Sequence, residues 1–231
     1  MTAKTITTCV FDAYGTLFDV TAAAREAAQA PEFPALADTW QALAASWRDK
    51  QVGYSWLRAV TGAHCDFWSV TQDALDYALE ANGLASDAAL RERLLQLYWE
   101  LSAYPEVPAM LSALKDAGMT TAILSNGSPD MLDGAVSSAG LNDLLDATLS
   151  VESVSIFKPS AKVYNLVETE LNVAKSEVLF VSSNGWDAGC AAAYGFETAW
   201  VNRLGLPQDR LHGVPHHTLV DLTTMPSLIK R

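Results

Sequence analysis

The sequence predicts an α/β fold in which a parallel sheet core carries an inserted helical domain. Short runs of strand-forming residues alternate with helical stretches along the whole chain of 231 residues, which is typical of strands joined by crossover helices. Between the first two runs lie roughly a hundred residues with almost no strand signal, far more than one crossover helix needs. This excess indicates an inserted domain.

The candidate strands are short runs rich in apolar and β-branched residues, at 6–11, 120–124, 178–181, 198–201 and 217–220. Each of the first three leads straight into polar residues, namely Asp12, then Ser125 and Asn126, then residues 182–184. Ligands of open, Rossmann-like parallel sheets bind outside the carboxyl ends of the strands. We therefore expect these polar groups to converge on one crevice.

The segment between the first two strands carries a helical pattern. Apolar residues such as Trp40, Leu43 and Trp47 recur there at spacings of three and four. Five of the seven tryptophans fall in this segment, and we expect them to pack in a small bundle, against the core or against a second subunit. The predicted division is a core of residues 1–19 and 103–231 and an insert of residues 20–102. An aromatic-rich insert also favours a homodimer.

The charge pattern limits the partners that we expect. The formal net charge is −12, and the 15 lysines and arginines are scattered, so neither nucleic acid nor a membrane surface is an expected partner. If the substrate is itself an anion, the overall field opposes its approach and local cations must hold it. Arg48 and Lys158 are candidates for that role.

The three cysteines, Cys9, Cys65 and Cys190, are far apart and lack the spacing of a zinc site, which favours a reducing compartment over disulfide bonds. No apolar run approaches the length of a membrane span, and the N-terminus lacks a secretory pattern. These features predict a cytoplasmic location.

The first sign of chemistry is Asp12, which leaves a predicted buried strand just before Gly15 permits a tight turn. Taken alone, an aspartate at a strand end is more often part of an Asx turn or a helix cap. A catalytic role therefore depends on the rest of the sequence.

Four segments, in order, resemble the motifs of the haloacid dehalogenase superfamily. They are Asp12-x-Tyr14-Gly15-Thr16, Ser125-Asn126-Gly127, Lys158-Pro159 and residues 182–187. The stretch Trp47-Arg48-x-Lys50-Gln51, with residues 54 and 56–58, further resembles a cap segment of the L-2-haloacid dehalogenases. Each motif alone is weak, but the ordered set covers nearly the whole chain. The resemblance implies a Rossmann-like core with a helical cap domain, and hydrolysis of short (S)-2-haloacids to (R)-2-hydroxyacids without metal or cofactor.

Two positions depart from the pattern of the superfamily's phosphatases. Those enzymes carry an aspartate at the position of Tyr14, as a general acid, and usually another at the position of Ser183, in a Mg²⁺ site. A departing halide needs no proton, so the loss of both carboxylates fits carbon-halogen displacement better. A Mg²⁺-dependent small-molecule phosphatase, and a binding protein that has lost catalysis, stay open as alternatives.

The resemblance also implies roles in two chemical steps. The Asp12 carboxylate attacks C2 of the substrate, which gives an enzyme ester and frees halide. Water then attacks the ester carbonyl, and a base must take its proton, for which Asp187 is the candidate. Lys158 keeps Asp12 ionised and oriented, and Thr16 donates a hydrogen bond to it.

The remaining implied roles concern the substrate. Arg48, Asn126 and the ring of Trp186 form a halide cradle. The substrate carboxylate is bound by Ser125 and by the backbone N–H groups near Ala13 and Tyr14. The resemblance gives supporting roles to Ser182 and Asn184, which position the water or brace Lys158, and to Tyr164, which supports the substrate end of the site.

Two apolar residues of the cap are expected to line the substrate pocket, Val52 and Phe67. The cap segment departs from the dehalogenase pattern at Asp49, Val52 and Gly53, so the substrate range is open. A compact pocket for a two- or three-carbon acid is the expectation.

Overall fold

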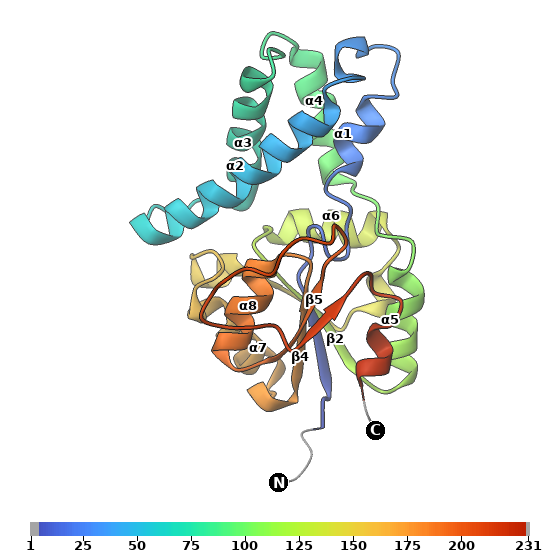
Figure 1. Cartoon of the computed structure of the whole chain (residues 1–231), viewed down its shortest axis with the longest axis vertical. Helices are drawn as coiled ribbons and strands as arrows, with labels where there is room; N and C mark the ends of the chain where they lie inside the picture. Colours follow the sequence, from blue (N-terminus) through green and yellow to red (C-terminus); the bar gives the residue numbers. More distant parts are fainter. Residues whose placement is uncertain (1–4, 230–231) are drawn as a thin grey trace.

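A six-stranded parallel sheet forms the centre of the molecule, in a computed structural model that describes residues 5–229 (Figure 1). The order across the sheet is β3-β2-β1-β4-β5-β6, and every adjacent pair is parallel. The strands are β1 (Thr8–Phe11), β2 (Thr120–Ser125), β3 (Ala147–Ser150), β4 (Val178–Ser182), β5 (Glu197–Val201) and β6 (His217–Leu219). The predicted fold class is confirmed.

Five of these strands lie within two residues of their predicted bounds, whereas β3 was missed. It is a four-residue strand at the edge of the sheet, and its residues are half-buried or exposed. Because only one of its sides is paired and neither face is fully covered, it lacks the continuous apolar run that marks the central strands.

Helices cover both faces of the sheet, with α7 and α8 on one side and α5 on the other (Figure 1). Their bounds are α5 (Val107–Asp116), α6 (Pro129–Ser138), α7 (Ala161–Leu171) and α8 (Gly185–Tyr194). Short 3-10 turns occupy Pro34–Leu36, Asn142–Leu144, Val151–Val154, Lys175–Glu177 and Met225–Leu228. This arrangement buries the central strands on both faces and leaves their carboxyl ends open to the site.

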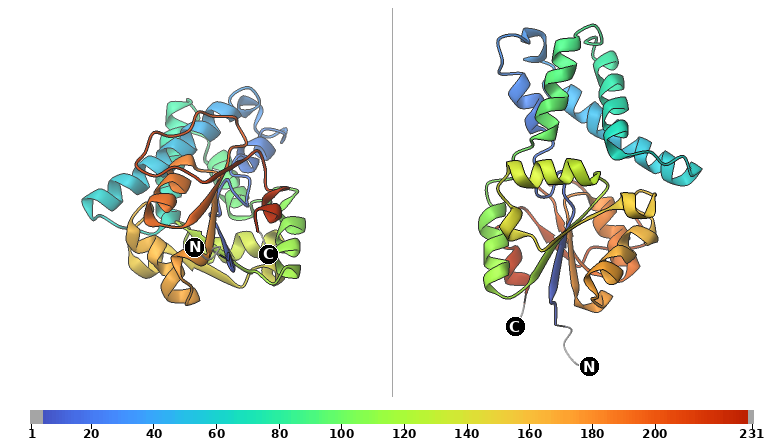
Figure 2. Two further views of the ribbon diagram at one scale, coloured as in Figure 1. Left: turned by 60° about the horizontal axis from the view of Figure 1, so that its bottom comes forward. Right: turned by 180° about the vertical axis from the view of Figure 1, so that it is seen from behind.

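Four further helices, α1 (Ala22–Ala27), α2 (Trp40–Thr61), α3 (Phe67–Ala81) and α4 (Ala88–Trp99), form a bundle above the carboxyl ends of the strands (Figure 2). Asp66 and Asp87 begin α3 and α4 by accepting hydrogen bonds from backbone N–H groups of the first turn, each at 2.9 Å. We call residues 20–102 the cap. The two chain segments that join it to the sheet lie side by side, because Tyr104 N donates to Leu17 O at 2.9 Å.

The cap tryptophans differ in their surroundings. Trp47 is buried, and its Nε1 donates to Thr71 O at 2.8 Å, which ties α2 to α3. Trp68 and Trp99 meet edge to face at 5.0 Å. Trp56 remains 38% exposed beside Trp186 of the sheet domain. The expected packing is therefore confirmed for Trp47, while Trp56 lies where cap and sheet meet.

No helix within residues 5–229 combines the length and the apolar character needed to cross a membrane.

Candidate active site

Asp12 lies at the carboxyl end of β1, the strand between β2 and β4. Its backbone N–H donates to Val181 O at 2.9 Å, which continues the pairing with β4. The chain then turns through Gly15, whose φ is +90° and whose missing Cβ would lie 3.0 Å from Ser183 Oγ. Because both the turn and the strand are fixed, the Asp12 carboxylate is held at the edge of the sheet.

Three side chains hold the Asp12 carboxylate. Lys158 Nζ lies 3.0 Å from Oδ1, while Thr16 Oγ1 and Asn184 Nδ2 lie 3.1 and 2.9 Å from Oδ2. The predicted hydrogen bonds from Lys158 and Thr16 are confirmed. Asp12 is only 6% exposed, so these bonds act in a region that water screens poorly.

Lys158 bridges two carboxylates, because its Nζ also lies 2.8 Å from Asp187 Oδ2. Burial lowers the pKa of Lys158, but the charges of Asp12 and Asp187 raise it, and the net shift is upward. Burial and then the charge of Asp12 raise the pKa of Asp187, against the opposing effect of Lys158. Lys158 is thus held as an ammonium ion, and Asp187 is a stronger base than an ordinary aspartate.

The sequence led us to expect Tyr164 at the substrate end of the site, but the structure places it against Asp187 instead. Its hydroxyl donates to Asp187 Oδ1 at 2.7 Å, and its ring packs edge to face on Phe180 of β4. The side chain is 1% exposed, because α7 covers a face of the sheet and directs it inward. Tyr164 therefore acts on Asp187 and lies outside the pocket lining.

Ser182 and Asn184 do not hydrogen-bond to Lys158 in the described part of the chain, although bracing Lys158 was one of the roles expected for them. The Ser182 hydroxyl accepts from Asn184 N at 3.2 Å, and Asn184 links Asp12 to Arg48, whose Nη2 lies 3.2 Å from Asn184 Oδ1. Within residues 5–229 neither side chain bonds to Lys158. The turn after β4 thus braces Asp12 and Arg48, because its side chains reach across the strand end toward β1.

At the end of β2, Ser125 Oγ accepts from Gly127 N at 3.1 Å, and Asn126 Oδ1 accepts from Lys158 N at 2.9 Å. The backbone N–H groups of Ala13 and Tyr14 have no acceptor within the described part of the chain. Ala13 is itself buried, so only its backbone is available to a ligand. Both strand ends thus present polar donors toward one space.

A small pocket joins these groups to the cap. Its lining comprises Asp12, Tyr14, Arg48, Val52, Ser55, Phe67, Ser125, Asn126, Asn184 and Trp186. Arg48 crosses from α2, with Nη2 3.2 Å from Tyr14 O, and Trp186 of the lining meets Trp56 of α2 edge to face at 5.2 Å. Nearly all the residues expected to contact substrate are therefore brought together.

Ser55 also lines the pocket and was missed by the sequence analysis. It lies seven residues after Arg48 and three after Val52, so all three share a face of α2. This spacing along α2 could have indicated from the sequence that Ser55 faces the pocket.

Comparison with known proteins agrees with this geometry. A family model described as haloacid dehalogenase-like hydrolase matches residues 6–195.

The chain belongs to this family.

Two curated relatives and one solved structure are similar to the chain over almost their full length. This hydrolase is 45% identical over 226 residues to (S)-2-haloacid dehalogenase 1 of Pseudomonas sp. (strain CBS-3), which covers 98% of this chain and 97% of that protein. It is 40% identical over 223 residues to (S)-2-haloacid dehalogenase 4A of Burkholderia cepacia, with 96% and 94% covered. The solved L-2-haloacid dehalogenase of Xanthobacter autotrophicus with chloropropionic acid covalently bound matches with a TM-score of 0.87, 39% identity, and 97% and 98% covered.

The donor set of this haloacid dehalogenase-like hydrolase does not fit a magnesium ion. Both oxygens of Asp187 are engaged, by Lys158 and Tyr164, and Ser183 supplies no carboxylate. Within residues 5–229, no three His, Cys, Asp or Glu side chains are grouped closely enough to hold a metal ion. Hard cations need several such oxygens, and here a lysine already neutralises the pair.

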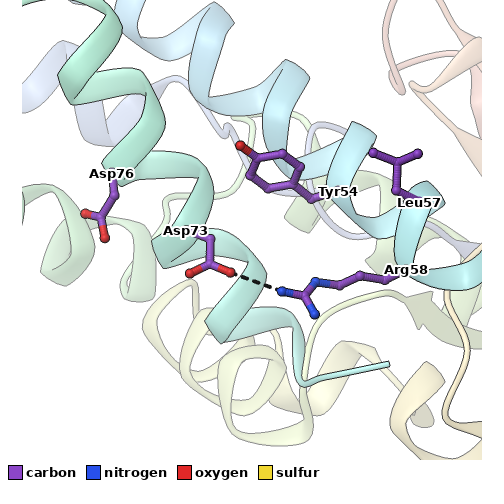
Figure 3. A pocket seen from close by; sticks show the side chains of 5 residues that line it. All are labelled: Tyr54, Leu57, Arg58, Asp73 and Asp76. Atoms are coloured by element: carbon purple, nitrogen blue, oxygen red, sulfur yellow. Dashed lines mark hydrogen bonds and ion pairs between the residues drawn. The ribbon is translucent and has the colours of Figure 1, made fainter. Parts of the chain in front are cut away.

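A wider hollow lies on the outer surface of the hydrolase's cap, between α2 and α3 (Figure 3). It is lined by Tyr54, Leu57, Arg58, Asp73 and Asp76, and Arg58 pairs with Asp73 at 3.2 Å. This hollow is larger than the Asp12 pocket but is open to solvent, and both of its carboxylates, Asp73 and Asp76, are exposed. The chemistry therefore belongs to the smaller pocket.

Proposed function

We propose that this enzyme hydrolyses short-chain (S)-2-haloacids to (R)-2-hydroxyacids and halide, through an ester on Asp12. The observation that carries this proposal is a buried carboxylate, held by Lys158, Thr16 and Asn184, that lines a pocket beside Arg48. A similar protein has been solved with chloropropionic acid covalently bound, which supports covalent chemistry in this family.

In the first step an oxygen of the Asp12 carboxylate attacks C2, the C2–halogen bond breaks, and the halogen leaves as halide with the bonding electrons. Holding the reacting atoms in line can supply about 7 to 11 kcal/mol of the barrier in well-oriented cases. The three hydrogen bonds to Asp12 provide that orientation. Attack from the side opposite the halogen inverts C2.

The substrate carboxylate would be held by Ser125 and by the free N–H groups of Ala13 and Tyr14. Arg48, Asn126 and Trp186 would surround the halogen. The oxygen of Asn126 is committed to Lys158 N, while its NH₂ group has no acceptor within residues 5–229 and is available to an anion.

The walls of the pocket are apolar where Val52 and Phe67 line it. Tyr14 adds a third wall next to Phe67, with ring centroids 6.1 Å apart. Burial raises the pKa of Tyr14 well above its usual range, with smaller contributions from Tyr98 and Asp12. Tyr14 thus stays neutral and cannot repel the substrate anion.

In the second step water attacks the ester carbonyl of Asp12, which returns the carboxylate to the enzyme and releases the hydroxyacid. We propose Asp187 as the base that takes the proton from water. The raised pKa of Asp187 and its place on the other side of Lys158 Nζ support this role.

The function is tested by one turnover of 2-chloropropionate with excess enzyme in ¹⁸O-labelled water. We expect chloride release that excess chelator does not diminish, and one ¹⁸O atom in the peptide that contains Asp12, because hydrolysis of the ester leaves a solvent oxygen on the enzyme. Label only in the product would contradict the ester. Turnover that stops with chelator would instead show that a metal ion takes part, and the metal-independent reaction would be wrong.

The Tyr164→Phe variant should shift the acid limb of ester hydrolysis to higher pH. The Tyr164 hydroxyl lowers the pKa of Asp187, so its removal raises that pKa, and the base becomes protonated at a higher pH. Single-turnover rates across pH would measure the shift. Tyr194→Phe, which removes a surface hydroxyl that contacts Glu168, is the control and should leave the limb in place.

We also propose that residues 20–102 act as a cap domain on a core of 1–19 and 103–231, and that the protein is a cytoplasmic homodimer. Exposed apolar residues on α2 and α3, Leu57, Val60 and Tyr77, support association through the cap. Acidic composition and scattered basic residues support the absence of nucleic acid and membrane partners.

A further inference from the structure

The helices of the cap meet at a buried polar cluster that takes no direct part in the proposed chemistry. Gln51 of α2 lies at its centre and is 1% exposed. Its Nε2 donates to Thr71 Oγ1 of α3 at 2.8 Å and to the hydroxyl of Tyr98 of α4 at 2.9 Å. Its Oε1 accepts from Arg48 Nη1 at 2.8 Å. Three cap helices therefore converge on one amide, and that amide contacts the cation of the site.

The donors and acceptors of this cluster permit only one orientation of the Gln51 amide. The single proton of the Thr71 hydroxyl is given to Phe67 O at 2.8 Å, so Thr71 Oγ1 can only accept from Gln51. The NH₂ group must then face Thr71, and the carbonyl oxygen must face Arg48. The hydrogen bond to the guanidinium is thus fixed by a residue on another helix.

Arg48 has two hydrogen-bonding ends with different partners. Nη1 is held within the cap by Gln51, whereas Nη2 reaches across to Tyr14 O and Asn184 Oδ1, each at 3.2 Å. The contact to Gln51 is shorter than the other two and is made by a buried group. The guanidinium is therefore oriented from the cap side before it meets the core.

We propose that Gln51 is a positioning residue that aims Arg48 at the departing halogen. This inference deepens the proposed function and rests on it. Arg48 must form its strongest contact when negative charge develops on the halogen, and a guanidinium fixed in advance loses no orientation at that moment. Tyr98 also stacks on Tyr14, with centroids 5.7 Å apart, so the same cluster locks the wall of the pocket.

A merely structural role for Gln51 makes a different prediction. A glutamine that only ties helices together should affect folding, and its loss should lower the rates for all substrates alike. A glutamine that aims Arg48 should matter most where halide departure is hardest, and should matter only while Arg48 is present. These consequences separate the two roles.

The test uses Gln51→Met, which keeps the length of the side chain and removes its hydrogen bonds. We expect kcat/KM for 2-chloropropionate to fall roughly ten- to hundredfold, as for loss of a hydrogen bond to a charged group. The fall for 2-bromopropionate should be smaller, because bromide is the better leaving group. In an Arg48→Met background, Gln51→Met should cause little further loss.

Gln96→Met is the matched control, because Gln96 Oε1 accepts from Arg93 Nη1 at 3.0 Å with the same three-residue spacing, on an exposed face of α4. This variant should leave kcat/KM unchanged for both substrates. If Gln51→Met fails to fold, Tyr98→Phe removes one partner of the same amide and should show the same leaving-group bias on a smaller scale. Equal losses for both substrates, or losses that add to those of Arg48→Met, would overturn the proposal.

A readout without turnover separates this proposal from the proposed function. In a crystal structure of Gln51→Met, Arg48 Nη2 should leave its contacts with Tyr14 O and Asn184 Oδ1. If the wild-type enzyme released no halide but Arg48 still moved, the dehalogenase function would fail while the positioning of Arg48 by Gln51 stood. An unmoved Arg48 would refute the positioning itself.

Discussion

Asp12→Asn is expected to abolish halide release while the protein stays folded. An amide is a far weaker nucleophile than a carboxylate, so no ester forms, and removal of a covalent nucleophile typically lowers kcat by roughly 10⁴-fold or more. The amide oxygen can still accept from Lys158 Nζ and the amide NH₂ group can donate to Thr16, so only the hydrogen bond from Asn184 Nδ2 loses its acceptor and the fold should be kept. Halide release and thermal unfolding measure the two expectations.

The control for that variant is Asp76→Asn, because Asp76 is an exposed carboxylate paired with Arg91 on the cap surface. It undergoes the same chemical change away from the pocket and should keep full activity. Halide release by a verified Asp12→Asn protein at a rate near that of the wild type would show that another group attacks carbon. The proposed ester on Asp12 would then be wrong.

The sheet and the position of Asp12 at a strand end could be predicted from local signals, whereas the role proposed for Asp12 depended on the ordered set of motifs. The central strands are buried on both faces and are therefore continuous apolar runs, and Asp12 follows the first of them and begins the turn in which Gly15 adopts a positive φ. The edge strand β3 has no such run, since one of its sides is unpaired.

Contacts between distant helices could not be predicted in the same way. The resemblance placed Tyr164 at the substrate end of the site, whereas the packing of α7 on the sheet turns it toward Asp187. Gln51 contacts Thr71 and Tyr98 only after three helices have assembled. The residues that touch Asp12 lie at strand ends, which topology brings together, while the residues that support them depend on packing.

The charges of the site balance before substrate arrives. Two carboxylates, Asp12 and Asp187, face two cations, Lys158 and Arg48, in a protein of formal net charge −12. A substrate anion that reaches the pocket therefore meets a locally neutral set of charges, although the net charge of the chain opposes its approach. Lys158 carries the larger share of this balance, because it is buried between both carboxylates.

Lys158→Met should therefore remove activity and also destabilise the fold. Breaking a buried ion pair by removing one partner typically costs about 3 to 5 kcal/mol, because the remaining charge is buried without compensation. Here two carboxylates would be left facing each other, with Lys158 Nζ gone from positions 3.0 and 2.8 Å away. Urea unfolding at pH 7 should show the loss, and halide release should fall with it because Asp12 is no longer held as an oriented anion.

The stability of the wild type and that of Lys158→Met should depend on pH in different ways. In the wild type the pKa of Lys158 is raised on folding, so its stabilising effect is complete below the ordinary lysine pKa and is lost only as pH rises through the raised value. In Lys158→Met the pKa of Asp187 should rise further, and protonation should relieve the repulsion, so the variant should regain stability from pH 8 to pH 5. Lys115→Met, which breaks a surface pair with Asp146, should cost at most about 1 kcal/mol and show no such recovery. A Lys158→Met protein as stable as the wild type at pH 8 would mean that the two carboxylates are not both charged, and the electrostatic basis of the site would have to be abandoned.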